Sequence, residues 1–349
     1  MEKINVGLVG YGFSGKVFHA PILDSLEEFH LSKIVSSQAE QVKIDLPFVQ
    51  VVENYQDLLN DDSLELLVIA SPNSTHFELA KEGLIAGKHI LVEKPFVIHS
   101  SDGKKLLDLA EQKRRCLSVY HNRRFDGDFL TIQKCLNQKK LGKINTYIAH
   151  YDRFRPQLKG GWKEEGLPGS GVLYDLGAHL IDQALQLFGL PQTVFADLGF
   201  QRESAKAFDY AHLVLNFDGI KAILHIGCIV ADPGPHFQIF GDRGSFLKYG
   251  MDPQESSLIA GNRPGEAGWG EDDENTYGIL TSQRDHQLVS EKIRTEKGGY
   301  QKFYFELGRA IKDGGTPPVK AEDALLVVRM IEYALQSHQE KRVVSVDVP

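Results

Sequence analysis

The chain has 349 residues, of which 42% are hydrophobic and 25% are charged, and its formal net charge is −8 at pH 7. This length and composition are typical of a folded globular protein with two domains, and they argue against a disordered chain. The negative charge argues against nucleic-acid binding and against docking on an anionic membrane, because both need a concentrated basic surface.

The sequence contains no apolar run as long as the ~20 residues of a transmembrane helix, and it has no N-terminal secretory signal pattern. Its three cysteines, Cys116, Cys135 and Cys228, are odd in number and widely spaced, which fits neither a disulfide framework nor a zinc site. We therefore expect a protein of the reducing cytoplasm that binds no metal.

Strand and helix patterns alternate over the first part of the chain, which predicts a parallel α/β domain over residues 1–120. The helix after Asn73 has a predicted capping box, Thr75 with Glu78, and a predicted C-terminal glycine, Gly87. The expected strands are Ile4–Val9, Leu31–Val35, Leu64–Ala70, His89–Glu93 and Leu117–Tyr120, with helices at 15–28, restarting at Pro21, and at 102–115.

The pattern changes near residue 121, which predicts a second domain over residues 121–349 with a different architecture. Residues 251–276 are rich in glycine, proline and acids, so a long surface excursion is expected there. The other expected elements are antiparallel strands at Thr146–Tyr151, His212–Phe217 and Lys221–Gly227, a hairpin of Phe237–Phe240 with Ser245–Tyr249, helices at Leu173–Phe188 and 321–337, and a last strand at Val343–Val348.

A glycine loop, Gly10-Tyr11-Gly12-Phe13-Ser14-Gly15, directly follows the first strand and opens a helix. In that context GxGxxG indicates dinucleotide binding, because the three glycines allow the tight turn, the close approach of the pyrophosphate, and helix–strand packing. The anion then lies at the helix N-terminus. The alternative interpretation is an ordinary strand–helix turn.

The end of the second strand bears on the choice of dinucleotide. NAD-binding sites usually carry Asp or Glu there, about 20 residues after the glycine loop, to hold the ribose 2′-hydroxyl. This chain has Ser36 and Ser37 instead, which can donate to a 2′-phosphate and do not repel it. NADP is therefore predicted over NAD, although two serines also suit a simple turn.

Two later strand ends carry polar residues, and ligands of open α/β sheets bind at such ends. These are Ser71-Pro72-Asn73, with His76 following, and Glu93-Lys94-Pro95. Pro95 favours an extended Lys94 and is compatible with a cis peptide bond. The Lys94 ammonium can stabilise negative charge that develops during hydride transfer, but a solvated loop lysine is the alternative.

Asp175 and His179 are four residues apart on a predicted helix and therefore share one face. Oxidation of an alcohol needs a base for the hydroxyl proton, and imidazole titrates in the right range. The carboxylate can orient the imidazole or bind a neighbouring hydroxyl. The alternative is an exposed pair that contributes little to stability.

Taken together, the glycine loop, Glu93-Lys94-Pro95, and Gly169-Ser170-Gly171 leading to Asp175-Leu176-Gly177-Ala178-His179 resemble the Gfo/Idh/MocA oxidoreductase family over nearly the whole chain. Within the family the chain is most similar to NADP-dependent dehydrogenases of scyllo-inositol and to uncharacterised bacterial relatives. That similarity rests on residues 12–21, 71–77, 121–126 and 152–156. The resemblance implies an α/β fold: a Rossmann domain followed by an α+β domain with a large, mainly antiparallel open sheet that commonly mediates oligomerisation.

The resemblance also implies roles for particular residues. Lys94 contacts nicotinamide ribose and substrate oxygen, Asp175 binds and orients, and His179 is the acid/base. Trp162 matches a Trp-Arg pair near the cofactor, but Lys163 replaces the arginine and lacks its planar fork. The expected cofactor-binding residues are Gly10, Gly12, Phe13, Ser14, Gly15, Ser36, Ser37, Ser71, Pro72, Asn73, His76, Glu93, Lys94, Trp162 and Lys163.

Substrate contacts are expected from Asn122, Arg123, Arg153 and Arg155, unless these arginines simply form a solvated face. Trp162 and Tyr174 are equally compatible with core or interface positions. The leading hypothesis is an NADP-dependent dehydrogenase of a cyclic polyol or sugar, with scyllo-inositol the best single substrate. The alternatives are another sugar or open-chain carbonyl substrate, or a non-catalytic NADP-binding regulator. A homodimer or homotetramer is expected.

Overall fold

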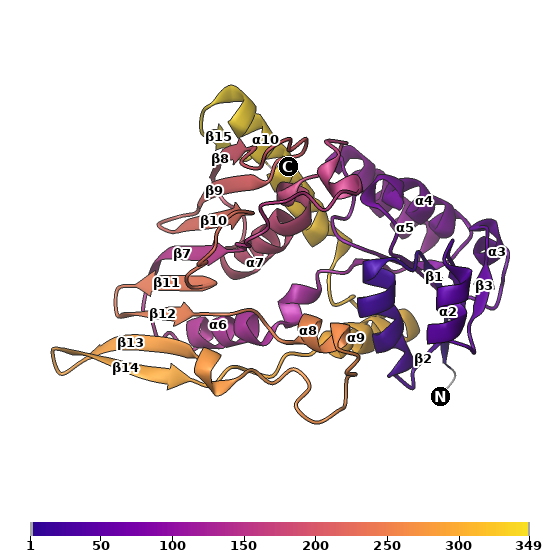
Figure 1. Cartoon of the computed structure of the whole chain (residues 1–349), viewed down its shortest axis with the longest axis horizontal. Helices are drawn as coiled ribbons and strands as arrows, with labels where there is room; N and C mark the ends of the chain where they lie inside the picture. The colour runs from indigo at the N-terminus through magenta and orange to yellow at the C-terminus, as the bar shows by residue number, and fades with distance from the viewer. Residues whose placement is uncertain (1–2, 348–349) are drawn as a thin grey trace. The chain divides into compact units, whose positions relative to one another are not determined.

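The computed structural model describes residues 3–347 and divides into two compact units (Figure 1). Three stretches of chain build each unit. The first unit comprises Met1–Phe125, Pro253–Trp269 and Gly299–Leu326, and the second comprises Asp126–Asp252, Gly270–Gly298 and Val327–Pro349. The division into domains 1–120 and 121–349 stays a prediction.

The first unit contains a six-stranded parallel sheet with the strand order β3-β2-β1-β4-β5-β6. This order is that of a Rossmann fold, in which the sheet reverses direction of growth between β1 and β4. The predicted strands are all present, with ends that differ by one or two residues. The strands are β1 (Ile4–Val9), β2 (Phe29–Val35), β3 (Gln50–Val52), β4 (Leu66–Ile69), β5 (His89–Val92) and β6 (Leu117–Val119).

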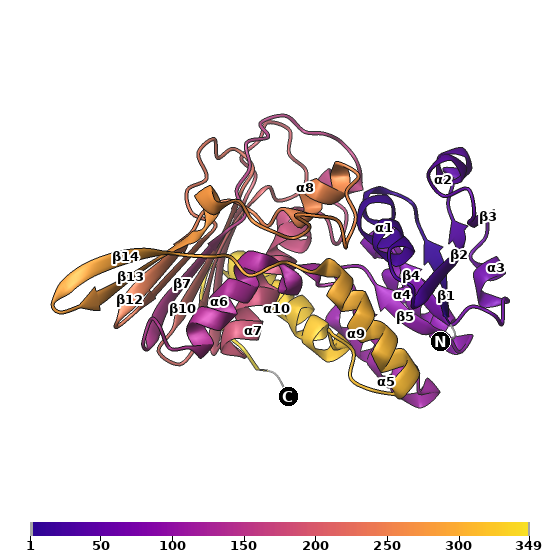
Figure 2. The ribbon, with the colours of Figure 1, turned by 90° about the horizontal axis from the view of Figure 1, so that it is seen from below.

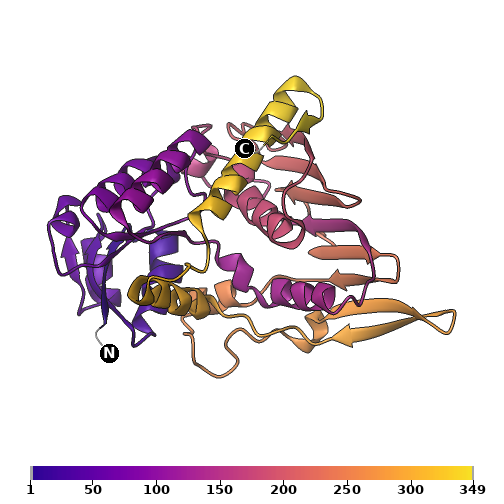
Figure 3. The same ribbon diagram turned by 180° about the vertical axis from the view of Figure 1, so that it is seen from behind.

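Helices cover both faces of this sheet, as the fully buried β4 requires (Figures 1 and 3). Helices α4 and α5 pack against each other, and α1 packs against α9. Helix α9 is not predicted from the sequence, although its buried aromatic residues form part of the core of this unit. The helices are α1 (Ala20–Asp24), α2 (Ala39–Asp45), α3 (Gln56–Leu59), α4 (His76–Ile85), α5 (Ser100–Lys113), α8 (Gln254–Ile259) and α9 (Tyr300–Asp313).

The predicted capping box at the start of α4 is wrong. Thr75 already has helical backbone angles, and its side chain makes no capping bond. Its hydroxyl donates instead to the Pro72 carbonyl, 2.8 Å away. The cause is the 3₁₀ turn Asn73–Thr75, which precedes α4 directly, whereas an N-cap residue needs an extended backbone. The predicted C-terminal glycine is confirmed, because Gly87 has φ of +77°.

The second unit contains a nine-stranded sheet with the order β14-β13-β12-β11-β7-β10-β9-β8-β15. It is mainly antiparallel, as predicted, but β7 and β10 run parallel, which corrects the expectation for those two strands. Val348, the predicted end of the last strand, lies outside the described residues. The strands are β7 (Ile144–His150), β8 (Thr193–Gly199), β9 (Tyr210–Asn216), β10 (Lys221–Gly227), β11 (Phe237–Gly241), β12 (Gly244–Lys248), β13 (Gly278–Arg284), β14 (Gln287–Ile293) and β15 (Val344–Ser345).

The longer helices of this unit all lie on one face of the nine-stranded sheet (Figures 2 and 3). They are α6 (Gly127–Asn137), α7 (Ala178–Phe188) and the C-terminal part of α10 (Ala321–Glu340). Residues alternate accordingly along β9, where Ala211, Leu213 and Leu215 are buried and their neighbours are only partly buried. The opposite face of the sheet carries none of these three helices, and we call it the open face.

The predicted surface excursion at 251–276 is only partly correct. The segment contains α8, and the side chains of Gln254 and Trp269 are buried. The Trp269 indole N–H donates to Gln301 Oε1 over 2.9 Å, which fixes this stretch against the start of α9. Residues 260–268 are mostly exposed, and Gly261, Gly265 and Gly268 have no atoms near their Cβ positions, so this part is a surface loop as predicted.

Among residues 3–347, no helix combines the length and the apolar character that crossing a membrane requires. Cys116, Cys135 and Cys228 are all present as thiols rather than as disulfides.

Candidate active site

The glycine loop forms the turn that the sequence predicts. Gly10 has φ of +95°, and a Cβ there would lie 2.8 Å from the Ala70 carbonyl oxygen. A Cβ at Gly15 would collide with the carbonyl of Gly10. Both positions therefore require glycine for reasons internal to the unit, namely the tight turn and the packing of helix against strand.

Gly12 is different, because no atom lies within 4 Å of the position that its Cβ would occupy. Packing within the chain does not explain a glycine there, whereas the close approach of a ligand does. Next to it, Phe13 is 59% exposed and rests edge-on against Phe18. The loop thus fits a bound dinucleotide, with open backbone at the second glycine of the motif.

Glu93, at the end of β5, connects this loop to the neighbouring strand end. Its carboxylate accepts a hydrogen bond from the Ser14 hydroxyl, lies 3.0 Å from His19 Nε2, and accepts the backbone N–H of Lys94 over 2.9 Å. Burial opposes ionisation, but the contacts with His19, Lys94 and Ser14 outweigh it and lower the pKa of Glu93 to about 2. A buried carboxylate therefore fixes the backbone from which Lys94 extends.

Two further contacts hold the ends of β4 and β5 together. The ring nitrogens of buried His76 lie 2.9 Å from the Pro95 carbonyl and 3.1 Å from the Ser71 carbonyl.

The Lys94–Pro95 peptide bond is cis. Lys94 is only partly exposed, which does not match the alternative of a fully solvated loop lysine. Asn73 is buried beside the same strand ends.

Ser36 and Ser37 follow β2, as the sequence places them. The Ser36 oxygen accepts the backbone N–H of Gln38 over 2.9 Å, just before α2 begins. This is a serine turn, and it leaves the hydroxyl hydrogen of Ser36 available to donate. Ser37 is exposed. The two interpretations of these serines are thus compatible, since the turn presents a donor at the strand end.

Asp175 and His179 lie on a helix whose first turn is irregular. Leu173–Gly177 is a π-helical turn that leads directly into α7 at Ala178. The predicted continuous α-helix is therefore corrected to a π turn followed by an α-helix. Single π turns within helices are frequent at functional sites.

His179 is not the surface residue of an exposed pair. It is only 6% exposed, and its ring stacks on that of Tyr151 with centroids 6.5 Å apart. Asp175 is more accessible, and its Oδ1 accepts a hydrogen bond from Lys163 Nζ over 2.7 Å. The Lys163 ammonium also lies 5.7 Å from the Trp162 ring. Lys163, which the sequence analysis expects at the cofactor, thus forms an ion pair with Asp175 within the second unit.

The residues predicted to contact substrate have different environments. Arg123 is buried and pairs with Glu255 Oε2 over 2.6 Å, so it does not belong to a solvated face. The Arg153 guanidinium lies 4.9 Å from the Tyr151 ring. Arg155 is exposed, and Asn122 is buried. Tyr174 is buried, as a core aromatic is.

Sequence reasoning missed two residues of this region, His19 and Tyr304. His19 is fully buried, and its Nδ1 lies 2.6 Å from the Tyr304 hydroxyl, while its Nε2 faces Glu93. His19 lies within the quoted motif, but Tyr304 comes from α9, 285 positions further along the chain. No local pattern predicts that contact.

The candidate residues divide between the two units. The glycine loop, both strand ends, Asn122 and Arg123 belong to the first, and Trp162, Lys163, Asp175, His179, Arg153 and Arg155 belong to the second.

Family models match both parts of the sequence. Residues 4–121 match the description "Oxidoreductase family, NAD-binding Rossmann fold", and residues 133–346 match "Oxidoreductase family, C-terminal alpha/beta domain". The chain belongs to the Gfo/Idh/MocA family. It is therefore an oxidoreductase with a dinucleotide-binding Rossmann fold.

Several Gfo/Idh/MocA relatives match the chain over its whole length. The scyllo-inositol 2-dehydrogenase (NADP(+)) IolW of Bacillus subtilis is 43% identical, over 99% of this chain and 97% of that protein. The uncharacterised oxidoreductase YdgJ of Escherichia coli is 42% identical, over 97% and 98%. The solved structure of oxidoreductase yvaA from Bacillus subtilis superposes with a TM-score of 0.97 at 43% identity, covering 99% of both chains.

Proposed function

We propose that this chain is an NADP-dependent dehydrogenase that oxidises a secondary alcohol of a cyclic polyol or sugar, with scyllo-inositol as the best single substrate. The reverse direction would reduce the corresponding ketone. The observation that carries the proposal is the pairing of a buried imidazole, His179, with a carboxylate one turn away in a chain 43% identical to a scyllo-inositol 2-dehydrogenase.

The cofactor preference is part of this proposal. Ser36 and Ser37 would donate to the 2′-phosphate, while the open backbone at Gly12 would face the pyrophosphate. The B. subtilis relative named above uses NADP(+), which favours the same choice. Ser71, Pro72, Asn73, His76, Glu93, Trp162 and Lys163 would complete the cofactor contacts.

A bound nicotinamide would supply the hydride acceptor for oxidation of the alcohol and the hydride donor for reduction of the ketone. His179 takes the hydroxyl proton as the alcohol is oxidised, and burial against Tyr151 limits the directions in which its ring can turn. The Lys94 ammonium donates to the same oxygen and stabilises its developing negative charge. Lys94 and His179 belong to different units, so their joint action on one oxygen is part of the proposal.

Asp175 would accept a hydrogen bond from a neighbouring substrate hydroxyl. Lys163 helps to orient that carboxylate, since its ammonium donates to Oδ1 over 2.7 Å. Arg153 and Arg155 would add donors for a hydroxyl-rich substrate. Arg123 and Asn122 are buried and would contribute through the shape of the site more than through free donors.

Two alternatives keep the same fold. In the first, the substrate is another sugar or an open-chain carbonyl compound, because pocket shape alone separates these from an inositol. In the second, the chain binds NADP without catalysis and regulates a partner. The presence of Lys94, Asp175 and His179 together weighs against the second alternative, since a sensor needs none of their chemistry.

The decisive experiment is a panel of inositol isomers and sugars with NADP and NAD, followed by absorbance of the reduced nicotinamide. We expect turnover with scyllo-inositol and NADP. We expect His179→Ala to lower kcat by about 10²- to 10⁴-fold while cofactor affinity, measured by fluorescence titration, is unchanged. His30→Ala, an exposed histidine of β2, is the matched control. Wild-type turnover in His179→Ala would refute the assigned role, and cofactor binding without turnover on any substrate would favour the regulator.

We also propose that the chain works as a homodimer or homotetramer in the reducing cytoplasm. The three unpaired thiols fit that compartment.

A further inference from the structure

A row of histidines crosses the open face of the nine-stranded sheet on the adjacent strands β7, β10 and β9. Figure 1 shows these three strands side by side. His150 of β7 is in register with His225 of β10, and His225 is in register with His212 of β9. Asp197 of β8 follows His212 in the same register. Side chains at directly opposed positions of adjacent strands lie close enough to interact, so the row is a continuous polar stripe.

Asp152, two residues after His150, lies on the same side of the extended chain and is enclosed by this row. Its side chain is only 2% exposed. Its Oδ2 lies 2.9 Å from His150 Nδ1, and its Oδ1 lies 2.8 Å from His225 Nδ1 and accepts the Gly227 backbone N–H over 2.8 Å. Burial by itself would raise the pKa of Asp152. The hydrogen bonds and charges of His150 and His225 outweigh that effect and lower the pKa to about 2.

The three side chains bring ligand atoms of the right kind together. One nitrogen from each histidine and one carboxylate oxygen all lie within 4.8 Å of one another. The rings of His150 and His225 have centroids 5.3 Å apart, and the His212 ring lies 6.0 Å from that of His225. Two imidazole nitrogens with one carboxylate suit Zn²⁺, Co²⁺, Ni²⁺ and Cu²⁺, whereas Mg²⁺ and Ca²⁺ prefer all-oxygen sites.

The cluster is separate from the residues of the proposed reaction. Along the segment from His150 to Arg153, side chains alternate between the two faces of the sheet. Tyr151 points to the helix-covered face, where it stacks on His179, while His150 and Asp152 point to the open face. The established family activity and the proposed dehydrogenase chemistry use none of these three residues.

We propose that His150, Asp152 and His225 form a binding site for a divalent transition-metal ion on the open face of the sheet. The ion replaces the two contacts between the imidazole nitrogens and Asp152 with bonds to both histidines and the carboxylate. His212, next in the row, has its ring 6.0 Å from that of His225 and borders the group. The ion links β7 to β10, which are the one parallel pair of strands in this sheet among the described residues.

The test is a titration of the full chain, first stripped of metal with a chelator, with Zn²⁺ against a chromophoric competitor. We expect one ion per chain and a higher Tm with zinc than without it, because an ion that binds only the folded chain stabilises it. Co²⁺ provides a second readout, since its visible absorption reports nitrogen and oxygen ligands directly.

The variants are His225→Gln and His150→Gln. Glutamine keeps a donor for Asp152, so the fold is retained, but it is a poor metal ligand; we expect zinc affinity to fall by about tenfold or more in each. His286→Asn, at an exposed histidine in the β13–β14 turn, is the matched control and should bind as the wild type does. No zinc binding by the wild-type chain, or wild-type zinc affinity in both glutamine variants, would overturn the proposal.

Discussion

Ser36 is the residue at which the proposed cofactor preference can be tested most directly. Its oxygen already accepts the Gln38 backbone N–H, and an aspartate at the same position makes the same turn. The fold should therefore tolerate the substitution, while the added negative charge at the end of β2 would repel a bound phosphate.

We expect Ser36→Asp to raise the Kd for NADP(H) by about tenfold or more, a change of about 1.4 kcal/mol, and to leave the Kd for NAD(H) unchanged or lower. Fluorescence titration of both reduced cofactors measures this. Ser36→Thr retains the hydroxyl and is the control. An unchanged NADP(H) affinity in Ser36→Asp would mean that the 2′-phosphate lies elsewhere.

Glu93 is the residue whose ionisation affects stability most clearly. Its pKa is lowered from 4.5 to about 2 in the folded chain, chiefly because the contacts with His19 outweigh the effect of burial. A carboxylate with a lowered pKa stabilises the fold above its unfolded pKa, and this contribution is lost as the pH falls through the folded pKa. The relevant window is therefore pH 4.5 down to about 2.

We expect the free energy of unfolding of the wild type to fall across this window by about 3 kcal/mol more than that of Glu93→Gln, which cannot ionise. Urea unfolding midpoints at several pH values give the comparison. Glu78→Gln, at an exposed glutamate of α4 paired with Lys81, should follow the wild type. Parallel curves for Glu93→Gln and wild type would contradict the expectation.

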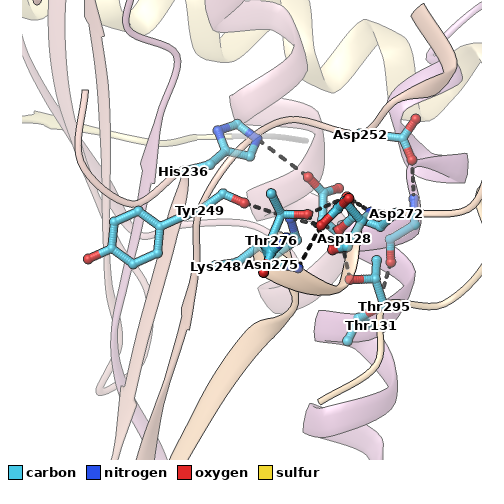
Figure 4. Close-up of polar contacts among 12 residues, drawn as sticks. Asp128, Thr131, His236, Lys248, Tyr249, Asp252, Asp272, Asn275, Thr276 and Thr295 are labelled. Atoms are coloured by element: carbon cyan, nitrogen blue, oxygen red, sulfur yellow. Dashed lines mark hydrogen bonds and ion pairs between the residues drawn. The ribbon is translucent and has the colours of Figure 1, made fainter. Parts of the chain in front are cut away.

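Among the elements, β12 carries a buried ion pair that joins it to the segment after Gly270 (Figure 4). Lys248 is 1% exposed, and its Nζ lies 3.0 Å from Asp272 Oδ2 and donates to the Tyr249 carbonyl. Asp272 also accepts hydrogen bonds from the hydroxyls of Thr276 and Thr295, at 2.7 and 2.8 Å. Removal of one partner of such a pair leaves an uncompensated buried charge.

Lys248→Met should therefore lower the free energy of unfolding by about 3–5 kcal/mol, as chemical unfolding will measure. Adding Asp272→Asn removes the orphaned charge and keeps one acceptor oxygen for a threonine hydroxyl, so the double variant should recover part of the loss. Arg284→Ala breaks an exposed pair with Glu291 and should cost about 0–1 kcal/mol. An equal loss of unfolding free energy in Lys248→Met and Arg284→Ala would show that burial does not strengthen the Lys248–Asp272 pair.

Two elements of the candidate site begin with π-helical turns, Gly15–His19 before α1 and Leu173–Gly177 before α7. The sequence predicts a helix in both places, and both segments are helical, although the first ends at Asp24 and not at residue 28. The apolar spacing cannot distinguish an i→i+5 turn from an i→i+4 turn over five residues, because the two differ by less than one residue per turn. The direction in which Asp175 points therefore depends on a backbone detail that the sequence pattern does not predict.

For the whole molecule, the proposed oligomer can be tested at an apolar row on the open face of the nine-stranded sheet. Ile148, Ile223, Val214 and Phe195 lie in register on four adjacent strands, and all are only partly buried. Large exposed apolar patches usually mark an interaction surface. The family resemblance also associates this sheet with oligomerisation.

We expect the wild type to run as a homodimer or homotetramer in size-exclusion chromatography with light scattering, and Ile223→Glu to shift it toward monomer. A charge in the centre of an apolar interface is costly to bury, whereas Ile44→Glu, at an exposed isoleucine of α2, should not change the mass. A monomeric wild type would refute the expectation.

The sequence by itself determined the Rossmann fold, the glycine loop and the identity of the residues proposed for catalysis. These depend on local properties: apolar strands, glycines at fixed spacing, and an Asp and a His one helical turn apart. Only the tertiary structure decided which partners those residues have. Ser14 meets Glu93, His19 meets Tyr304, and Lys163 meets Asp175.

The same distinction explains the features that the sequence did not predict. These features depend on segments that are separated along the chain. They are helix α9, the parallel pairing of β7 with β10, the buried Lys248–Asp272 pair and the row of histidines. Hydrophobic periodicity reports which face of a segment is buried, but not against what it packs. Contacts of that kind form only when the whole sheet assembles, since strand order and register bring their side chains together.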